Sequence, residues 1–262
     1  MDQIIRKSFF LSAGDANAEG ELSLPVLTNK IIEIATEHAN SLGIGNPDMA
    51  DIHAGWVLSR LTIQMDYYPK VNESYTISTW IEDFNRHFST RNFKIESENG
   101  KVCGYARSIW IVMDSVERSL LSLSHLSLPE NMISGENVPI PRQEKHIPVL
   151  PQETGEKTQK KFIPATHPQF DYQFAFCDID SYRHVNTVRY VTLLLNQFSL
   201  EEHDKTMVRR LELSFLHEAS FGLRTSLFRA DSAEKPLDSI FQLSDTKDFS
   251  PLLFSRVYRQ NR

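Results

Sequence analysis

The segment Asp178–Tyr190, DIDSYRHVNTVRY, combines side chains that can move protons with the start of a helical pattern. Two carboxylates (Asp178 and Asp180), an imidazole (His184) and a carboxamide (Asn186) lie within nine residues. The first turn of a helix presents unpaired N–H groups and the positive end of the helix dipole, so it favours an oxygen that gains negative charge. A proton-transferring group at such a place suits acyl transfer, in which a carbonyl oxygen becomes an oxyanion.

Each of these side chains also has a structural interpretation. Aspartates before a helix commonly cap it, which we favour for Asp178, whereas Asp180 fits a cap or a catalytic role equally well. A lone histidine in a first helical turn is more often structural or solvated, because its positive charge opposes the helix dipole. Asn186 is expected to make backbone hydrogen bonds rather than to contact a substrate. The residues alone leave the role of this segment open.

Periodicity predicts the elements that position the segment. Residues 171–178 form a short strand-like run. Apolar residues then recur in steps of three and four, the spacing of one helical face, at Val185, Val188, Val191, Leu195 and Phe198. Runs typical of strands follow at 207–215, 223–230, 238–244 and 251–259.

The first half of the chain repeats this order. Ser23 and Pro25 open a predicted helix that ends at Gly43. Its apolar or small face comprises Leu27, Ile31, Ile34, Ala35, His38 and Leu42. Strand-like runs follow at 61–67, 74–82, 87–97 and 102–114, with a hairpin turn at 98–101.

The repeated order predicts the fold. One helix can cover a sheet of several strands only if the sheet curls around it, which favours an α+β fold of two tandem hot-dogs (a double hot-dog), each a long central helix wrapped by an antiparallel sheet. Seven of the 12 prolines lie between residues 129 and 168, in a polar stretch without periodicity. We therefore predict an N-terminal repeat at 1–128, a proline-rich connector at 129–168 and a C-terminal repeat at 169–262.

Composition excludes several classes of protein. The 262 residues carry 28 basic and 34 acidic side chains, a net charge of −6, which argues against a generic nucleic-acid binder. No apolar run reaches the roughly 18 residues of a membrane span, and the start has no signal-peptide core, so we expect a cytoplasmic protein. The two cysteines, Cys103 and Cys177, lack metal-ligand spacing, and both are expected to pack as small hydrophobic residues.

The motifs together resemble the acyl-acyl-carrier-protein (acyl-ACP) thioesterases, the fatty-acyl hydrolases of plant plastids and bacteria, and we expect a bacterial member. DIDSYRHVNTVRY is similar to the family's D-x-[D/N]-x-N-x-H-V-N-N-x-x-Y segment. Further similar stretches are WVLSRLTIQMDYYPKVNESYTISTW (56–80), RHFSTRNFKI (86–95) and FLHEASFG (215–222). The resemblance covers nearly the whole chain, from about Phe9 to Tyr258.

The resemblance implies hydrolysis of acyl thioesters, with Asp180, His184 and Glu218 as catalytic residues. Tyr182 stands where the family has a catalytic asparagine, and Ala219 where some members have a cysteine. We therefore expect water to attack, with Glu218 and His184 as its general base, Asp180 orienting the imidazole, and N–H groups around Val185 and Asn186 holding the oxyanion. No metal or other cofactor is expected.

The resemblance also implies a site for the acyl chain in the first repeat. We expect it around Ile31, Ile34, Trp56, Leu58, Ile77 and Trp80, although each of these alone could be plain core.

The implied partner is an acyl carrier protein that bears a phosphopantetheine-linked acyl chain. Because such carriers are acidic, docking needs local basic residues. Candidates are residues 157–161 (KTQKK), Arg183, Arg189, Arg209 and Arg210. A homodimer is plausible. Alternatives are a non-hydrolytic acyl or acyl-carrier binding protein, an acyl-CoA thioesterase, or a hydratase or dehydratase built on the same fold.

Overall fold

The computed structural model describes residues 2–49, 51, 53–123, 130–144, 149, 162 and 167–262. The chain divides into two compact units, Met1–Pro141 (unit 1) and Arg142–Arg262 (unit 2). This division falls inside the predicted connector, residues 129–168. Much of that connector, including residues 157–161, lies outside the described part of the chain.

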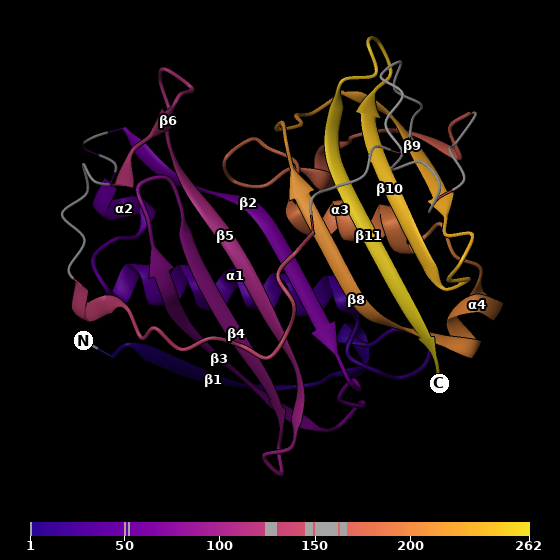
Figure 1. Cartoon of the computed structure of the whole chain (residues 1–262), viewed down its shortest axis with the longest axis horizontal. Coiled ribbons are helices and arrows are strands. Elements are labelled where there is room, and N and C mark those ends of the chain that lie inside the picture. Colours follow the sequence, from indigo (N-terminus) through magenta and orange to yellow (C-terminus); the bar gives the residue numbers. More distant parts are fainter. Residues whose placement is uncertain are drawn as a thin grey trace. The chain divides into compact units, whose positions relative to one another are not determined.

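Unit 1 is an antiparallel sheet with one long helix against it (Figure 1). The strand order is β1-β3-β4-β5-β2, and a short β6 pairs with β5. The strands are β1 (Ile4–Phe10), β2 (Ala54–Met65), β3 (Ser74–Phe84), β4 (Ser89–Ser97), β5 (Val102–Asp114) and β6 (Leu120–Leu121). The helices are α1 (Leu24–Ser41) and α2 (Asn46–Met49), with 3-10 turns η1 (Ala13–Asp15) and η4 (Glu130–Met132).

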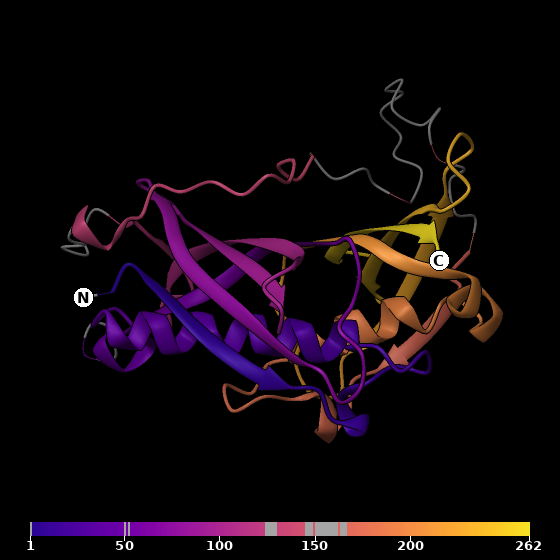
Figure 2. The same cartoon turned by 90° about the horizontal axis from the view of Figure 1, so that it is seen from below.

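Helix α1 forms where the sequence predicts it. The Ser23 side chain caps its start by accepting the Val26 N–H, and Gly43, with φ of 72°, follows its end. The predicted face is buried, with Ile31 and Ile34 at 1% and 0% exposure. Truncating either to alanine would remove about 2–5 kcal/mol of stability. Figure 2 shows α1 lying along one face of the unit 1 sheet.

Two features of unit 1 differ from the prediction. Strand β1 was not predicted, because Lys7 interrupts its apolar alternation; the Lys7 ammonium instead pairs with Glu33 and Glu37 of α1. Strand β2 begins at Ala54, well before the predicted start at residue 61. Its first part was missed because residues from Gly55 to Arg60 are all partly exposed and show no alternation of burial.

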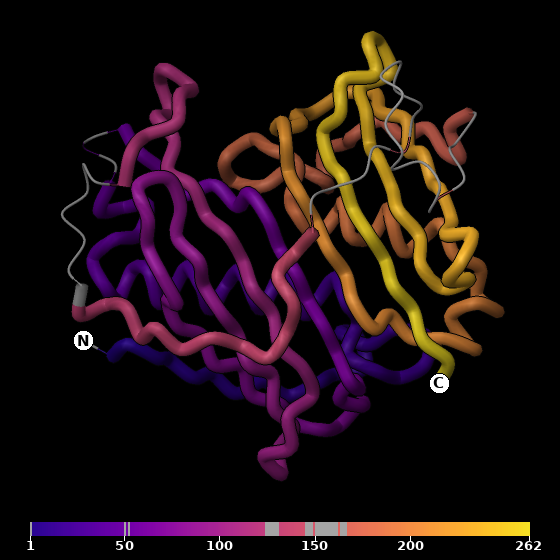
Figure 3. The backbone as a smooth tube through the Cα atoms, viewed as in Figure 1, coloured from indigo at the N-terminus to yellow at the C-terminus, as the bar shows by residue number. Residues whose placement is uncertain are grey.

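The segment 133–140 crosses the face of the unit 1 sheet that lies opposite α1 (Figures 2 and 3). Trp80 of β3 donates its indole N–H to Glu136 O at 2.7 Å, and Arg107 of β5 donates to Ile140 O at 3.2 Å. Val138 and Ile140 pack against the Trp80 ring. This segment therefore covers the outer face of the sheet with both apolar contacts and hydrogen bonds.

Unit 2 has the same kind of architecture, with strand order β8-β11-β10-β9-β7 and all pairs antiparallel. The strands are β7 (Phe170–Gln173), β8 (Thr206–Phe215), β9 (Arg224–Asp231), β10 (Asp238–Asp245) and β11 (Pro251–Asn261). A 3-10 turn η6 (Phe176–Asp178) precedes helices α3 (Thr187–Leu195) and α4 (Leu200–Lys205). The predicted helix is present but shorter, because Asn186 caps its start and Asn196 its end.

Within the described residues, no helix has the length and apolar character that crossing a membrane would require.

Candidate active site

Asp180 closes the loop between η6 and α3. Its Oδ1 accepts the backbone N–H groups of Tyr182 at 2.9 Å and His184 at 3.1 Å. Its own N–H donates to His184 O at 2.8 Å. Between them, Arg183 adopts a left-handed conformation with φ of 68°. Asp180 therefore fixes the backbone of His184 at the end of a tight turn.

The same loop lies beside the segment that follows β8. His184 forms an antiparallel bridge with Ser220, and the Val185 N–H donates to Ala219 O at 2.9 Å. This pairing brings the His184 Nε2 to 3.3 Å from the Glu218 Oε2, with the two side chains 34% and 28% exposed. An imidazole and a carboxylate from two different elements thus meet where solvent can reach both.

Two expected contacts are absent among the described residues. The Asp180 carboxylate bonds the backbone of His184 and makes no bond to its ring. The N–H groups of Val185 and Asn186, expected to face an oxyanion, already donate to Ala219 O and Asp178 O. In the first turn of α3, the N–H of Val188 donates to the Asn186 side chain. In the described part of the chain, only the Thr187 N–H at this helix start lacks an acceptor.

The structural interpretations hold for two of the polar residues. Asn186 is the N-cap of α3 through its side-chain oxygen. Asp178 is buried, accepts the Tyr172 hydroxyl and the Ala175 N–H, and pairs with Arg189 at 3.6 Å. Tyr182 is 63% exposed, with its backbone bonded to Asp180.

The cysteines lie outside this site. Cys103 is buried in β5, as expected, whereas Cys177 is exposed, because it lies in the η6 turn rather than in a strand. Ala219, beside Glu218, is 1% exposed and supplies no thiol.

A loop of the same form precedes α1 in unit 1. Asn17 Oδ1 accepts the Glu21 N–H at 2.8 Å, and the Asn17 N–H donates to Glu21 O at 2.8 Å. Gly20, with φ of 71°, has the place that Arg183 has in unit 2. The Leu22 N–H donates to Pro69 O at 2.8 Å, as Val185 donates to Ala219.

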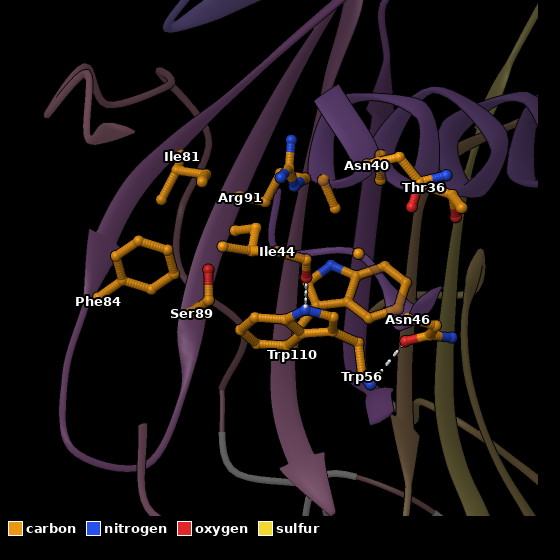
Figure 4. Close-up of a pocket in the computed structure, with 13 residues that line it drawn as sticks. Thr36, Asn40, Ile44, Asn46, Trp56, Ile81, Phe84, Ser89, Arg91 and Trp110 are labelled. Atoms are coloured by element: carbon orange, nitrogen blue, oxygen red, sulfur yellow. Dashed lines mark hydrogen bonds between the residues drawn. The ribbon is translucent and has the colours of Figure 1, made fainter. Parts of the chain in front are cut away.

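Unit 1 also contains a pocket between α1 and the sheet (Figure 4). It opens to solvent and has about 510 Å³ of atom-free space, a figure that includes the open solvent at its mouth. Trp56 forms part of its wall, held by bonds from its indole N–H to Ile44 O at 2.7 Å and from its backbone N–H to Asn46 Oδ1 at 3.0 Å. The lining residues are Ala35, Thr36, Ala39, Asn40, Ile44, Gly45, Asn46, Trp56, Ile81, Phe84, Ser89, Arg91 and Trp110.

The six residues expected at an acyl site are not together in this pocket. Trp56 lines it. Ile31, Ile34 and Ile77 are fully buried core residues, and Leu58 is partly exposed on β2. Trp80 packs under segment 133–140 on the other face of the sheet, because neighbouring residues of a strand point to opposite faces.

Comparison with known proteins identifies the family. The family model for the acyl-ACP thioesterase N-terminal domain matches residues 2–125, and that for the acyl-ACP thioesterase C-terminal domain matches residues 164–246. The chain belongs to the acyl-ACP thioesterase family. It spans about half the length of the curated relatives that it matches.

Individual members of the acyl-ACP thioesterase family agree with this assignment. The chain is 22% identical to the chloroplastic acyl-[acyl-carrier-protein] hydrolase FATB3 of Cuphea viscosissima, over 97% of this chain and 58% of the relative. A crystal structure of an acyl-ACP thioesterase from Bacteroides thetaiotaomicron is 26% identical, with a TM-score of 0.85 over 98% of both chains. The 12:0-ACP thioesterase from Umbellularia californica shares the fold, with 17% identity and a TM-score of 0.82 over 100% of this chain and 99% of that chain.

The basic residues expected to dock a carrier protein differ in how exposed they are and in whether they are already paired. Arg183 is exposed at the tip of the Asp180 loop. Arg189 is partly exposed but is tied to Asp178 and to Cys177 O. Arg210 is largely buried and pairs with Glu212 at 2.6 Å, so it is not a surface charge.

Of the residues that line the pocket, only Trp56 was predicted as a site residue from the sequence. Arg91 and Trp110, for example, lie on β4 and β5, in runs predicted only as strands. A weak signal was available: His38, a polar residue on the otherwise apolar face of α1, indicated a polar partner in the core.

Proposed function

We propose that this chain is a thioester hydrolase that releases free fatty acid from acyl-ACP. The observation that carries the proposal is the His184–Glu218 pair, at 3.3 Å, in a chain of the acyl-ACP thioesterase family. A carboxylate that accepts a proton while an imidazole holds the same water is a suitable general base for attack on a thioester.

The proposed mechanism uses water as the nucleophile. Glu218, with His184, takes a proton from water as its oxygen attacks the acyl carbon, which gives a tetrahedral oxyanion. The Thr187 N–H, which has no acceptor among the described residues, is the backbone donor available to that oxyanion at the start of α3. The C–S bond then breaks, and the proton taken from water goes to the departing thiolate. Asp180 is a positioning residue that acts through the backbone of His184.

We also propose that the chain is a tandem hot-dog in which only unit 2 keeps the catalytic set. The matching hydrogen bonds of the two loops support this. By that correspondence, Asn17, Glu21 and Tyr68 of unit 1 stand where Asp180, His184 and Glu218 stand in unit 2. None of the three unit 1 residues is identical to its counterpart, so we expect one active site per chain.

The pocket of unit 1 is the proposed site for the acyl chain. Trp56, Trp110, Ile44, Ile81 and Phe84 give it mostly apolar walls, which suits a hydrocarbon chain. The acyl carrier protein is the proposed donor. A homodimer and a cytoplasmic location stay predictions.

The test is release of free thiol, read with a thiol reagent, from acyl-ACP and from acyl-CoA across a series of chain lengths. Faster release from acyl-ACP supports the proposal, and equal or faster release from acyl-CoA makes the chain an acyl-CoA thioesterase. Saturable binding without thiol release would make it a binding protein. An altered acyl chain with the thioester intact would make it a hydratase or dehydratase.

A further inference from the structure

Arg91 brings a positive charge into the wall of the unit 1 pocket. It lies on β4, is only 5% exposed, and lines the pocket together with Trp56 and Trp110. Figure 4 shows its side chain between α1 and the two indole rings. Burial lowers the pKa of Arg91 to about 9, so the guanidinium remains protonated at neutral pH.

The two hydrogen-bond partners of Arg91 are both neutral. Its Nη1 donates to His38 Nδ1 at 2.7 Å and to Thr79 Oγ1 at 3.4 Å. Because a guanidinium can only donate, His38 Nδ1 is the acceptor, and its Nε2–H donates to Asp2 O at 3.0 Å. Burial, together with the nearby Arg91, lowers the pKa of His38 to about 4, which keeps this imidazole uncharged.

The other buried arginines are paired differently. Within the described residues, Arg107 and Arg259 are also buried. The Arg107 Nε lies 3.4 Å from a Glu82 carboxylate oxygen, and the Arg259 Nη2 lies 3.1 Å from one of Glu202. Arg91 makes no ion pair with any described carboxylate. A buried cation without a counter-charge is costly, so its lack of an anion calls for an explanation.

Part of the Arg91 guanidinium is still available to a ligand. Among the described residues, its Nε and Nη2 have no acceptor. Neither nitrogen is fully enclosed by protein, so both remain accessible from the solvent side. Since Arg91 borders the pocket, this open side is where an anion could approach.

We propose that the pocket binds an apolar chain that ends in a carboxylate, with the carboxylate on Arg91. A guanidinium edge matches the two oxygens of a carboxylate, and the indole rings with Ile44, Ile81 and Phe84 bury the hydrocarbon. A methyl end at the same place would leave the cation without a counter-charge. The carboxylate has two sources: a free fatty acid, or the carboxylated far end of an acyl chain. The inference rests on the proposed function in taking the chain to be an acyl chain.

Binding of decanoate and of 1-decanol, followed by titration calorimetry, tests the proposal without any catalysis. The wild-type protein should bind decanoate about tenfold to a hundredfold more tightly than the alcohol, as expected for a hydrogen bond to a charged group. Arg91→Met should remove this preference, and Arg91→Lys should keep part of it. The matched control is Lys94→Met, which removes a charge from the same strand outside the pocket and should leave the preference unchanged.

Equal affinity of the wild-type protein for decanoate and 1-decanol would overturn the proposal. This test uses only the wild-type protein and so does not depend on whether a variant folds. A preference that survives in Arg91→Met protein with a native thermal transition would overturn it as well. The proposed function fails separately, when thiol release is absent although decanoate binds.

Kinetics with two thioesters distinguish the sources. If the ligand is the far end of the substrate, an ω-carboxydecanoyl thioester should have a lower KM than the decanoyl thioester, and Arg91→Met should abolish the difference. If the ligand is free fatty acid, the two thioesters should have equal KM values, and decanoate should inhibit the wild-type protein but not Arg91→Met. Either pattern supports the carboxylate site. If an active protein shows neither of the two patterns, the carboxylate site is refuted.

Discussion

At the scale of single residues, the site depends on one contact between two otherwise ordinary side chains. Glu218 follows β8 and His184 precedes α3, and the bridge between His184 and Ser220 brings them together. The resemblance to the family predicts that His184 and Glu218 act together, and the structure places His184 Nε2 3.3 Å from Glu218 Oε2. The sequence did not predict that the Val185 N–H is taken by Ala219 O, because that bond depends on a segment some thirty residues away.

Replacing Glu218 by glutamine should lower kcat for thioester hydrolysis by about two or more orders of magnitude, because the general base is lost. His184→Ala should have a similar effect. The double variant should be little worse than either single one, since the two residues act as a unit. Steady-state thiol release measures all three. Glu234→Gln, an exposed position in the same unit, is the control, and wild-type-like kinetics of Glu218→Gln would remove the residue from the mechanism.

His38 should make the fold sensitive to acid. Its pKa is lowered from 6.5 to about 4 by burial and by Arg91, so between these values the unfolded chain binds a proton that the folded chain does not. Stability is therefore full above about pH 6.5 and falls as the pH drops toward 4, by up to about 3 kcal/mol. Urea unfolding at pH 7 and pH 4.5 measures the loss.

His38→Gln, which retains an acceptor for Arg91, should show a smaller loss over the same pH interval. An identical loss in the variant would assign the acid sensitivity to other groups.

At the scale of elements, the periodicity of the sequence predicted individual helices and strands. It did not predict the contacts that arise only when strands pair and helices pack. The buried face of α1 follows from local spacing, and β3 and β5 form where strand-like runs are predicted. Strand β1 was hidden by Lys7, whose partners are on α1. Likewise, the pocket could not be located, because Arg91, Trp56 and Trp110 come from three strands and become neighbours only through the register of the sheet.

The Asp180 loop holds Arg183 in a left-handed conformation that glycine adopts without strain, as Gly20 does in unit 1. Arg183→Gly should therefore leave the loop intact and raise stability by up to about 1 kcal/mol, whereas Gly20→Ala should lower it by about 1–2 kcal/mol. Thermal unfolding monitored by circular dichroism measures both. A loss of stability in Arg183→Gly would mean that the arginine side chain holds the loop.

At the scale of the whole molecule, net charge opposes the proposed partner. The chain carries −6, and carrier proteins are acidic, so association depends on local basic residues such as Arg183 and Arg189. At physiological ionic strength, interactions between exposed charges more than about 8 Å apart are largely screened, and added salt shortens this distance.

We accordingly expect kcat/KM for acyl-ACP to fall several-fold or more between about 0.05 M and 0.5 M NaCl, where the Debye length shortens about threefold. The rate with an acyl-pantetheine, which has the same thioester but no carrier protein, should change little. Parallel salt profiles for the two substrates would contradict docking by charge.

The placement of the His184–Glu218 pair in unit 2 and of the pocket in unit 1 has a consequence for protein engineering. Substitutions at Ala35, Ala39 or Phe84 can be screened for altered selectivity while the proposed catalytic residues of unit 2 are left untouched. A library confined to those positions should yield many variants that still turn over, and randomising both halves at once should yield few.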